Sequence, residues 1–228
     1  MQHASVNILI LEDNRWDVEL IKAELKHAHI AYRQVFVAEN REQFVRALDE
    51  FPFDLILSDY NLPQFNAISA LQMVEQKFQD IPFIVVTGTL NEETAVDTIK
   101  SGAWDYVLKE NMVRLGPAIN NALTLKKQKA KLKAARQEIR KISSGVEQSP
   151  TAILFADHLG SIEYVNSRFE RMTGYTKEEV VGKDVRMLQE SLGEDVYEEM
   201  WTTVRAGKEW RHTLQNRKKD RTAYWERL

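Results

Sequence analysis

The 228-residue sequence predicts an α/β fold class: a doubly wound, five-stranded parallel sheet, followed by a long helical linker and a smaller α+β domain. Three observations support this interpretation. Short apolar runs alternate with amphipathic helical patterns through the first half of the chain. These runs are nearly continuous in Ile, Val and Leu, as strands covered on both faces require. From Val146 onward the pattern changes to shorter strands, turns and several short helices.

The elements of the first domain follow one another regularly. Strands are predicted at residues 6–11, 35–37, 55–57, 83–86 and 106–108. Helices are predicted from about Trp16, near Gln43, over residues 68–78 and near Ala95. In the first helix, four apolar residues share one face: Val18, Ile21, Leu25 and Ala28. Such βα repeats predict a parallel sheet, in which ligands bind outside the carboxyl ends of the strands.

A long helical pattern then runs from Met112 to Ile142, and we expect it to break at Ser143-Ser144-Gly145. Within it, candidate coiled-coil a and d positions recur at heptad spacing: Leu125, Leu132 and Ile139, with Gln128, Ala135 and Ile142. This seam predicts a homodimer that pairs through residues 125–142. A monomeric helix with a solvated surface is the alternative, because only about three heptads are present.

The predicted domain limits are 1–124 for the first domain, 125–145 for the helical coiled-coil linker and 146–228 for the second domain. In the second domain, strands are predicted at residues 152–156 and 162–165, near 210–216 and at 222–225. Because the sequence ends at Leu228, inside or just after a predicted strand, we expect this domain to be incomplete at its C-terminus, with a further strand and any later domain missing.

The net charge of −3 is unevenly distributed along the chain. It is −8 over residues 1–124, +7 over residues 125–145 and −2 over residues 146–228. The basic run lies in one helical segment without interleaved aromatic residues, so we interpret it as a solvated helix face and expect no nucleic-acid partner.

The composition also bounds the compartment and the available chemistry. No apolar run is long enough to span a bilayer and the N-terminus lacks a secretory signal, so we expect a cytoplasmic location and no membrane partner. The absence of cysteine excludes disulfides, thiolate chemistry and cysteine metal sites.

Polar features follow four of the predicted strands, at the edge of the sheet where a ligand would bind: Glu12-Asp13, Asp59, Thr87 and Lys109. Each alone is typical of a turn or a helix cap. Together they suggest one site. Crowded carboxylates favour a hard divalent cation such as Mg²⁺. One carboxylate can then attack a phosphoryl group, while an ammonium and a hydroxyl stabilise the charge on the equatorial oxygens.

These features resemble the signature of a known family. Glu12-Asp13, Ser58-Asp59, Thr87-Gly88 and Tyr106-Val107-Leu108-Lys109 are similar to the signature of the receiver domain of two-component response regulators, which has a flavodoxin-like fold. The resemblance covers residues 5–125. It implies that Asp59 accepts a phosphoryl group from a sensor histidine kinase or phosphotransfer protein.

The same resemblance implies roles for the surrounding residues. Asp13 and Asp59 would bind Mg²⁺ directly, Glu12 would bind it through water, and the backbone carbonyl of Asn61 would be a further ligand. Lys109 and Thr87 would bind the phosphoryl oxygens.

Tyr106 would be the switch aromatic, whose side-chain rotamer follows Thr87. The alternative is a half-buried aromatic residue without a switching role. In receiver domains the residue after this lysine is commonly proline, whereas Lys109 is followed by Glu110-Asn111 in this sequence. Residues 105–115 resemble a receiver subclass usually found ahead of sensor or catalytic modules.

The second domain resembles a PAS domain, a module that encloses a small-molecule pocket or relays a signal. The resemblance rests on residues 162–166, Phe169, Thr173-Gly174-Tyr175 and residues 178–182. The ligand, if any, stays unknown, because the fold does not fix the function.

Residues 182–189 and 216–220 further resemble the flavin-binding, light-sensing branch of that family. Arg186 and Asn216 stand where that branch contacts the flavin phosphate and ring. Val185, however, stands where the branch carries its photoreactive cysteine, so we expect no light-driven adduct.

The sequence therefore predicts a signal-transduction response regulator that is not itself an enzyme. A flavin-binding light or redox sensor fused to a receiver is one alternative. A phosphohydrolase acting through a phospho-aspartate is another; it would need an acid/base carboxylate two residues after Asp59, where Asn61 stands.

Overall fold

The computed structural model describes residues 5–63, 65–78, 80–88, 92–188 and 192–228. The chain divides into two compact units, Met1–Lys133 and Ala134–Leu228. No helix in the described ranges is both long and apolar enough to cross a bilayer.

The first unit contains a five-stranded parallel sheet in the order β2-β1-β3-β6-β7. Its strands are β1 (Val6–Leu11), β2 (Tyr32–Ala38), β3 (Leu55–Ser58), β6 (Phe83–Thr87) and β7 (Asp105–Leu108). The predicted fold class is confirmed. Directly after β3, the short strands β4 (Asn61–Leu62) and β5 (Phe65–Asn66) form an antiparallel pair that the sequence did not predict.

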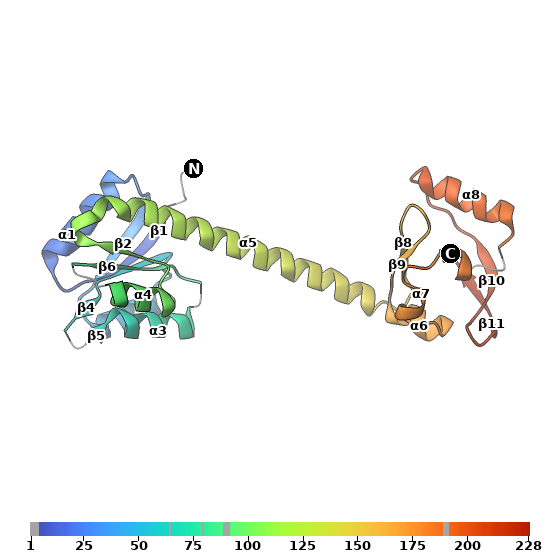
Figure 1. The fold of residues 1–228 in the computed structure, drawn as a ribbon, viewed down its shortest axis with the longest axis horizontal. Helices are drawn as coiled ribbons and strands as arrows, with labels where there is room; N and C mark the ends of the chain where they lie inside the picture. The colour runs from blue at the N-terminus through green and yellow to red at the C-terminus, as the bar shows by residue number, and fades with distance from the viewer. Residues whose placement is uncertain (1–4, 64, 79, 89–91, 189–191) are drawn as a thin grey trace. The chain divides into compact units, whose positions relative to one another are not determined.

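Helices cover both faces of this sheet (Figure 1). Alternate residues of β1 face opposite sides, so Ile8 and Ile10 pack with α1 (Arg15–His27) and with the start of α5 (Leu115–Glu147). Leu9 and Leu11 pack instead with α2 (Arg41–Glu50) and α3 (Ala67–Lys77). The helix α4 (Glu92–Lys100) precedes β7, and the 3₁₀ helix η1 (Lys109–Arg114) follows β7.

Asparagine residues fix where three of these helices begin. The side chains of Asn14, Asn40 and Asn66 accept hydrogen bonds from backbone N–H groups of the first turns of α1, α2 and α3, at 2.9, 3.0 and 2.8 Å. An asparagine N-cap satisfies a donor that the helix itself leaves unpaired. Asn14 therefore sets the position of α1 directly after the carboxyl end of β1.

The first part of α5 packs tightly on α1. A Cβ atom added at Gly116 would lie 2.5 Å from the Cβ of Ala28, so glycine allows the two helices to approach closely. Further along, Lys126 donates to the carbonyl of Asp54 at 3.1 Å, Lys129 lies 4.4 Å from the ring centroid of Trp104, and Lys133 pairs with Asp80 at 3.3 Å. The basic run is thus partly engaged with the first unit rather than wholly solvated.

The predicted helix break at Ser143-Ser144-Gly145 is wrong, because α5 continues through these residues to Glu147. One glycine inside a helix costs only about 1 kcal/mol relative to alanine. Contacts at the helix end offset this cost: the side-chain amide of Asn166 donates to Val146 O at 2.9 Å, and Ser167 N donates to Glu147 Oε1 at 3.0 Å.

In its described residues, the second unit contains the end of α5, two antiparallel hairpins and several shorter helical elements. The hairpins are β8 (Leu154–Ala156) with β9 (Ile162–Val165), and β10 (Thr213–Arg217) with β11 (Ala223–Arg227). The helical elements are α6 (Ser167–Thr173), α7 (Lys177–Val180), η2 (Val185–Leu188) and α8 (Glu194–Arg205).

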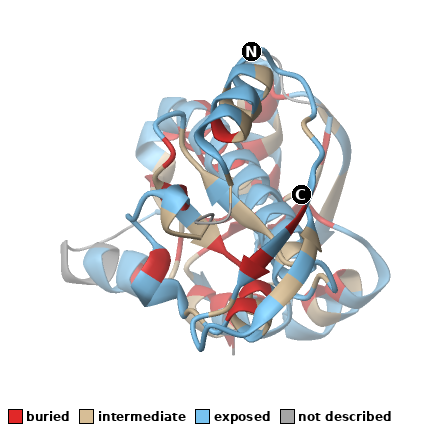
Figure 2. Ribbon diagram, turned by 90° about the vertical axis from the view of Figure 1, so that its right-hand side faces the viewer, coloured by how far each residue is buried: buried red, intermediate tan, exposed pale blue. Residues whose placement is uncertain are grey.

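Apolar residues from several of these elements form the core of the second unit: Ile162, Val165, Phe169, Val180, Val185 and Tyr197. Figure 2 distinguishes such buried residues, in red, from the pale blue exposed positions that cover the outer faces of the helices. This agrees with the predicted α+β class.

Asn166 is the most heavily bonded residue of this unit among those described. Its side-chain oxygen accepts from the backbone N–H groups of Ile153 and Phe169, both at 2.9 Å. Its side-chain nitrogen donates to the carbonyls of Val146 and Thr151, at 2.9 and 3.0 Å. This fully buried side chain therefore joins the end of α5, the chain before β8 and the start of α6.

Candidate functional site

The candidate site lies at the carboxyl edge of the five-stranded sheet. Glu12 follows β1, Asp59 follows β3, Thr87 ends β6 and Lys109 follows β7. These four strands are neighbours in a parallel sheet, so their carboxyl ends meet at the same edge.

Lys109 is the centre of a carboxylate cluster. Its ammonium nitrogen lies 2.8 Å from Glu12 Oε2, 3.1 Å from Asp59 Oδ1 and 2.6 Å from Asp17 Oδ2. The side chains of Lys109 and Glu12 are only 16% and 1% exposed. Because little water screens these charges, their interactions are stronger than those of surface ion pairs.

Burial and charge act in opposite directions on this cluster. Burial raises the pKa of Glu12, and the hydrogen bond from Lys109 only partly opposes that rise. Burial also lowers the pKa of Lys109, but hydrogen bonds to Asp17 and Glu12 outweigh it and raise the pKa above its ordinary value. Lys109 is therefore a cation at neutral pH.

The carboxylate of Asp59 is held at both oxygens. Oδ1 faces Lys109, and Oδ2 accepts a hydrogen bond from the backbone N–H of Asn61 at 3.2 Å. The backbone N–H of Asp59 donates to Leu11 O at 2.8 Å, and the hydroxyl of Ser58 donates to Asp59 O at 2.8 Å. These contacts fix the orientation of a buried carboxylate at the sheet edge.

The structure places the other predicted residues around this cluster. Thr87 is buried at the end of β6, whereas Asp13 and Asn61 are exposed. Tyr106 is partly buried, and the guanidinium of Arg114 lies 5.7 Å from the centroid of its ring.

The donor set around Asp59 fits Mg²⁺ in its chemistry. The side chains of Asp13 and Asp59 and the carbonyl of Asn61 offer only oxygen atoms, which hard cations prefer. In the part of the chain that the structure describes, however, no group of three or more His, Asp and Glu side chains is arranged to hold a metal ion. The Lys109 ammonium lies between the carboxylates of Glu12 and Asp59 instead.

Asp17 was not predicted as a site residue. It lies in the first turn of α1, where an acidic side chain is ordinarily explained by its favourable interaction with the helix dipole. The distance of 2.6 Å to the Lys109 nitrogen shows that it belongs to the cluster. Only the tertiary arrangement, which brings η1 next to α1, reveals this.

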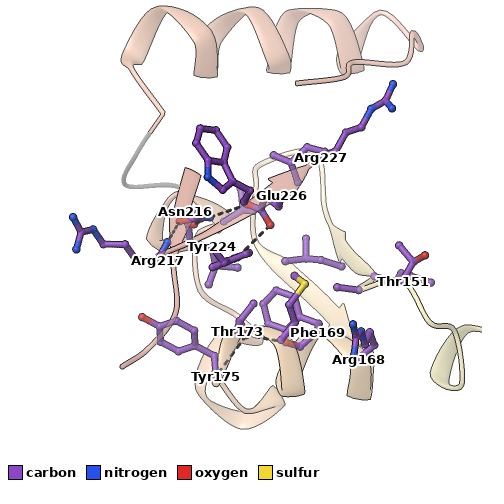
Figure 3. Close-up of a pocket in the computed structure, with 18 of the residues that line it drawn as sticks. Thr151, Arg168, Phe169, Thr173, Tyr175, Asn216, Arg217, Tyr224, Glu226 and Arg227 are labelled. Carbon is purple, nitrogen blue, oxygen red and sulfur yellow. Dashed lines mark hydrogen bonds between the residues drawn. The ribbon is translucent and has the colours of Figure 1, made fainter. Parts of the chain in front are cut away.

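A second candidate site is a cavity of about 610 Å³ in the second unit, between β8, α6 and the β10–β11 hairpin (Figure 3). Phe169 and Val185 contribute apolar surface, whereas Arg217 and Arg227 point away from the centre. Asn216 lines the cavity, and its amide already donates to Leu188 O at 2.5 Å and to Glu226 Oε1 at 2.9 Å.

The described residues that resemble the flavin-binding branch do not all line the cavity. Among the described residues that line the cavity, Val185 and Asn216 are present but Arg186 is not. The guanidinium of Arg186 lies 4.4 Å from the centroid of the Tyr197 ring instead. Gln189, the last residue of the stretch that resembles this branch, lies outside the described residues.

Comparison with known proteins confirms the family resemblance of both parts. A family model described as "Response regulator receiver domain" matches residues 8–120, and one described as "PAS domain" matches residues 150–228. The "Bacterioopsin transcriptional activator" of Halobacterium salinarum is 24% identical over 230 aligned positions, which cover 95% of this chain and 32% of that protein.

Other similar proteins match part of the chain. The "Transcriptional regulatory protein ZraR" of Escherichia coli K12 is 28% identical over 109 residues, covering 48% of this chain and 24% of that protein. The chain thus spans about a third or less of the length of these two relatives. A signal receiver domain of a putative Luxo repressor protein from Vibrio parahaemolyticus has a TM-score of 0.50 at 24% identity, covering 57% of this chain and 98% of that domain. This likeness supports the fold.

Proposed function

Because the chain combines a response regulator receiver domain with a PAS domain, we propose that it is a signalling response regulator in which Asp59 accepts a phosphoryl group. This proposal rests mainly on one observation. The buried Asp59 carboxylate lies at the sheet edge, with Oδ1 3.1 Å from a charged lysine and Oδ2 held by the backbone of Asn61. Such a carboxylate is an oriented nucleophile beside a positive charge.

In the proposed reaction, a carboxylate oxygen of Asp59 attacks the phosphorus of a phospho-histidine. The new O–P bond forms while the N–P bond of the donor breaks, and the bonding electron pair leaves with the donor nitrogen. Lys109 and Thr87 bind the phosphoryl oxygens. The donor is a sensor histidine kinase or a phosphotransfer protein, both of which operate in the cytoplasm.

Mg²⁺ would be held by the carboxylates of Asp13 and Asp59 and by the carbonyl of Asn61, with Glu12 acting through water. When bound, it supplies positive charge that offsets the repulsion between the carboxylates and the phosphoryl oxygens. Lys109 alone cannot neutralise the carboxylates that surround it, which supports the need for a second cation.

We expect phosphoryl uptake to depend on this cation. Incubation with acetyl phosphate and Mg²⁺ should add one phosphoryl group per chain, and excess chelator should reduce the rate at least tenfold. Intact-mass spectrometry measures both. Equal uptake with Mg²⁺ and with chelator would contradict the proposed metal site.

The helix α5 is the proposed route from the receiver to the PAS domain, with Thr87 and Tyr106 as the switch residues. Two contacts support this route. The start of α5 packs in the receiver core, and its last residues, Val146 and Glu147, accept hydrogen bonds from Asn166 and Ser167 of the PAS domain.

We propose domain limits of 1–124, 125–145 and 146–228 for receiver, linker and PAS domain.

We also propose that the chain is a homodimer paired through residues 125–142. The apolar seam positions Leu125, Leu132, Ile139 and Ile142 are all exposed in the single chain. A parallel partner helix would bury them. Neither nucleic acid nor membrane is part of the proposal.

Replacing Leu132 and Ile139 together by asparagine should shift the chain from dimer to monomer, because both a positions would lose their apolar contact. Light scattering at high micromolar concentration measures the mass. Gln137→Asn, at an exposed position off the a/d seam, is the matched control and should leave the dimer intact. If the parent chain were a monomer in both phosphorylation states, the proposed dimer through residues 125–142 would be contradicted.

The flavin-sensor alternative has less support. The chain has no cysteine, and Val185 lines the cavity where a photoreactive thiol would be needed. The amide donors of Asn216 are already bonded to Leu188 and Glu226. A relay role, or an apolar ligand in the cavity, agrees better with these contacts.

A further inference from the structure

The Lys109 ammonium is held by one carboxylate that has no role in the proposed reaction. Asp59 is the proposed nucleophile, and Glu12 is the proposed water-mediated metal ligand. Asp17 has neither role, yet its Oδ2 makes the shortest contact with the Lys109 nitrogen, 2.6 Å against 2.8 and 3.1 Å for the other two.

Asp17 lies on a helix that is capped at its start and packed against the core. It lies in the first turn of α1, whose start is fixed by the Asn14 cap and whose buried face packs through Val18, Ile21 and Leu25. Lys109, by contrast, carries its charge on a flexible four-carbon stem. A carboxylate on a fixed helix can therefore restrict where the ammonium lies.

A fixed position of the Lys109 ammonium matters when Asp59 is phosphorylated. When Asp59 forms its bond to phosphorus, its carboxylate charge is lost and Lys109 must bind the incoming phosphoryl oxygens instead. We propose that Asp17 is a positioning residue that holds the Lys109 ammonium where it can bind these oxygens, and that it acts only through Lys109. This inference rests on the proposed phosphorylation of Asp59.

A purely structural explanation makes a different prediction. If Asp17 served only to complement the dipole of α1, its loss would weaken the helix whether or not Lys109 were present. Asp17→Asn is a suitable variant because it keeps the size of the side chain. The Asp17 side chain is 26% exposed, and Lys109 keeps Glu12 and Asp59 as partners.

The test is a double-mutant cycle on the rate of phosphorylation by acetyl phosphate. At saturating donor, Asp17→Asn should lower the rate constant about tenfold with little change in the half-saturating donor concentration. Asp17→Glu should recover most of the rate. Glu19→Gln, on the same helix with a 69% exposed side chain paired to Lys22, is the matched control and should react like the parent.

In a Lys109→Met background, Asp17→Asn should have no further effect, because the residue through which it acts is gone. Thermal melting checks that each variant is folded. An unchanged rate in Asp17→Asn, or an equal loss with and without Lys109, would overturn the inference.

A second measurement does not depend on phosphorylation. The Lys109 ammonium should give a resolved, slowly exchanging ¹H–¹⁵N signal, identified by its absence in Lys109→Arg. Asp17→Asn should speed its exchange with water about tenfold or more, since a neutral amide oxygen replaces one of its three carboxylate acceptors and binds an ammonium more weakly, and Asp17→Glu should restore it. If the parent takes up no phosphoryl group, the proposed function fails, and this signal still decides the role of Asp17: an unchanged exchange rate would overturn it.

Discussion

Replacing Asp59 by asparagine is expected to abolish phosphoryl uptake. The amide keeps the size of the side chain but lacks the anionic oxygen that attacks phosphorus. It also removes the negative charge that lies 3.1 Å from the Lys109 nitrogen. We expect the rate with acetyl phosphate and Mg²⁺ to fall at least about a thousandfold, below detection by intact-mass spectrometry.

Asp49→Asn is the matched control for this experiment. Asp49 is an exposed aspartate on α2 that pairs with Lys77 at 3.4 Å, outside the carboxylate cluster. This variant should react like the parent. Labelling of Asp59→Asn at the parent's rate would show that another residue accepts the phosphoryl group.

Replacing Asn166 by alanine is expected to destabilise the PAS domain strongly. The side chain is fully buried and makes four hydrogen bonds to backbone groups, which alanine cannot replace. Leaving buried donors and acceptors unsatisfied costs about 1–3 kcal/mol each, and partial rehydration reduces the sum, so we expect a loss of about 3 kcal/mol.

Hydrogen–deuterium exchange measures this effect separately in each domain. Peptides from residues 150–228 should lose about a hundredfold in protection in Asn166→Ala, whereas receiver peptides should keep theirs. Glu163→Ala, an exposed residue of β9, is the control and should stay within about 0.5 kcal/mol of the parent. Unchanged protection in Asn166→Ala would contradict the bonding described for this side chain.

Much of the fold and of the candidate site could be predicted because the relevant signals are local. The strands of the receiver are short runs of buried apolar residues, and β1 lies where its Ile and Leu run predicts it. Parallel strands place their carboxyl ends together, so residues as distant in sequence as Glu12 and Lys109 could be assigned to one edge. Their ammonium–carboxylate distance is 2.8 Å.

The remaining features depend on tertiary contacts that no local pattern contains. Asp17 looks like an ordinary first-turn acid until η1 brings Lys109 to it. The helix α5 passes through Gly145 because its end is bonded to Asn166 and Ser167. Lys129 looks solvated in sequence, yet it lies over the Trp104 ring. In each case, a long-range partner overrides or adds to the local preference.

The position of the phosphoryl group tests the central proposal most directly. Borohydride reduces the acyl phosphate of an aspartate to homoserine, which leaves a fixed mass change that tandem mass spectrometry can locate. After incubation with acetyl phosphate and Mg²⁺, we predict homoserine at position 59 and at no other aspartate. Homoserine at Asp13, or a stable phosphoryl group on a histidine, serine or threonine with Asp59 unmodified, would contradict the account.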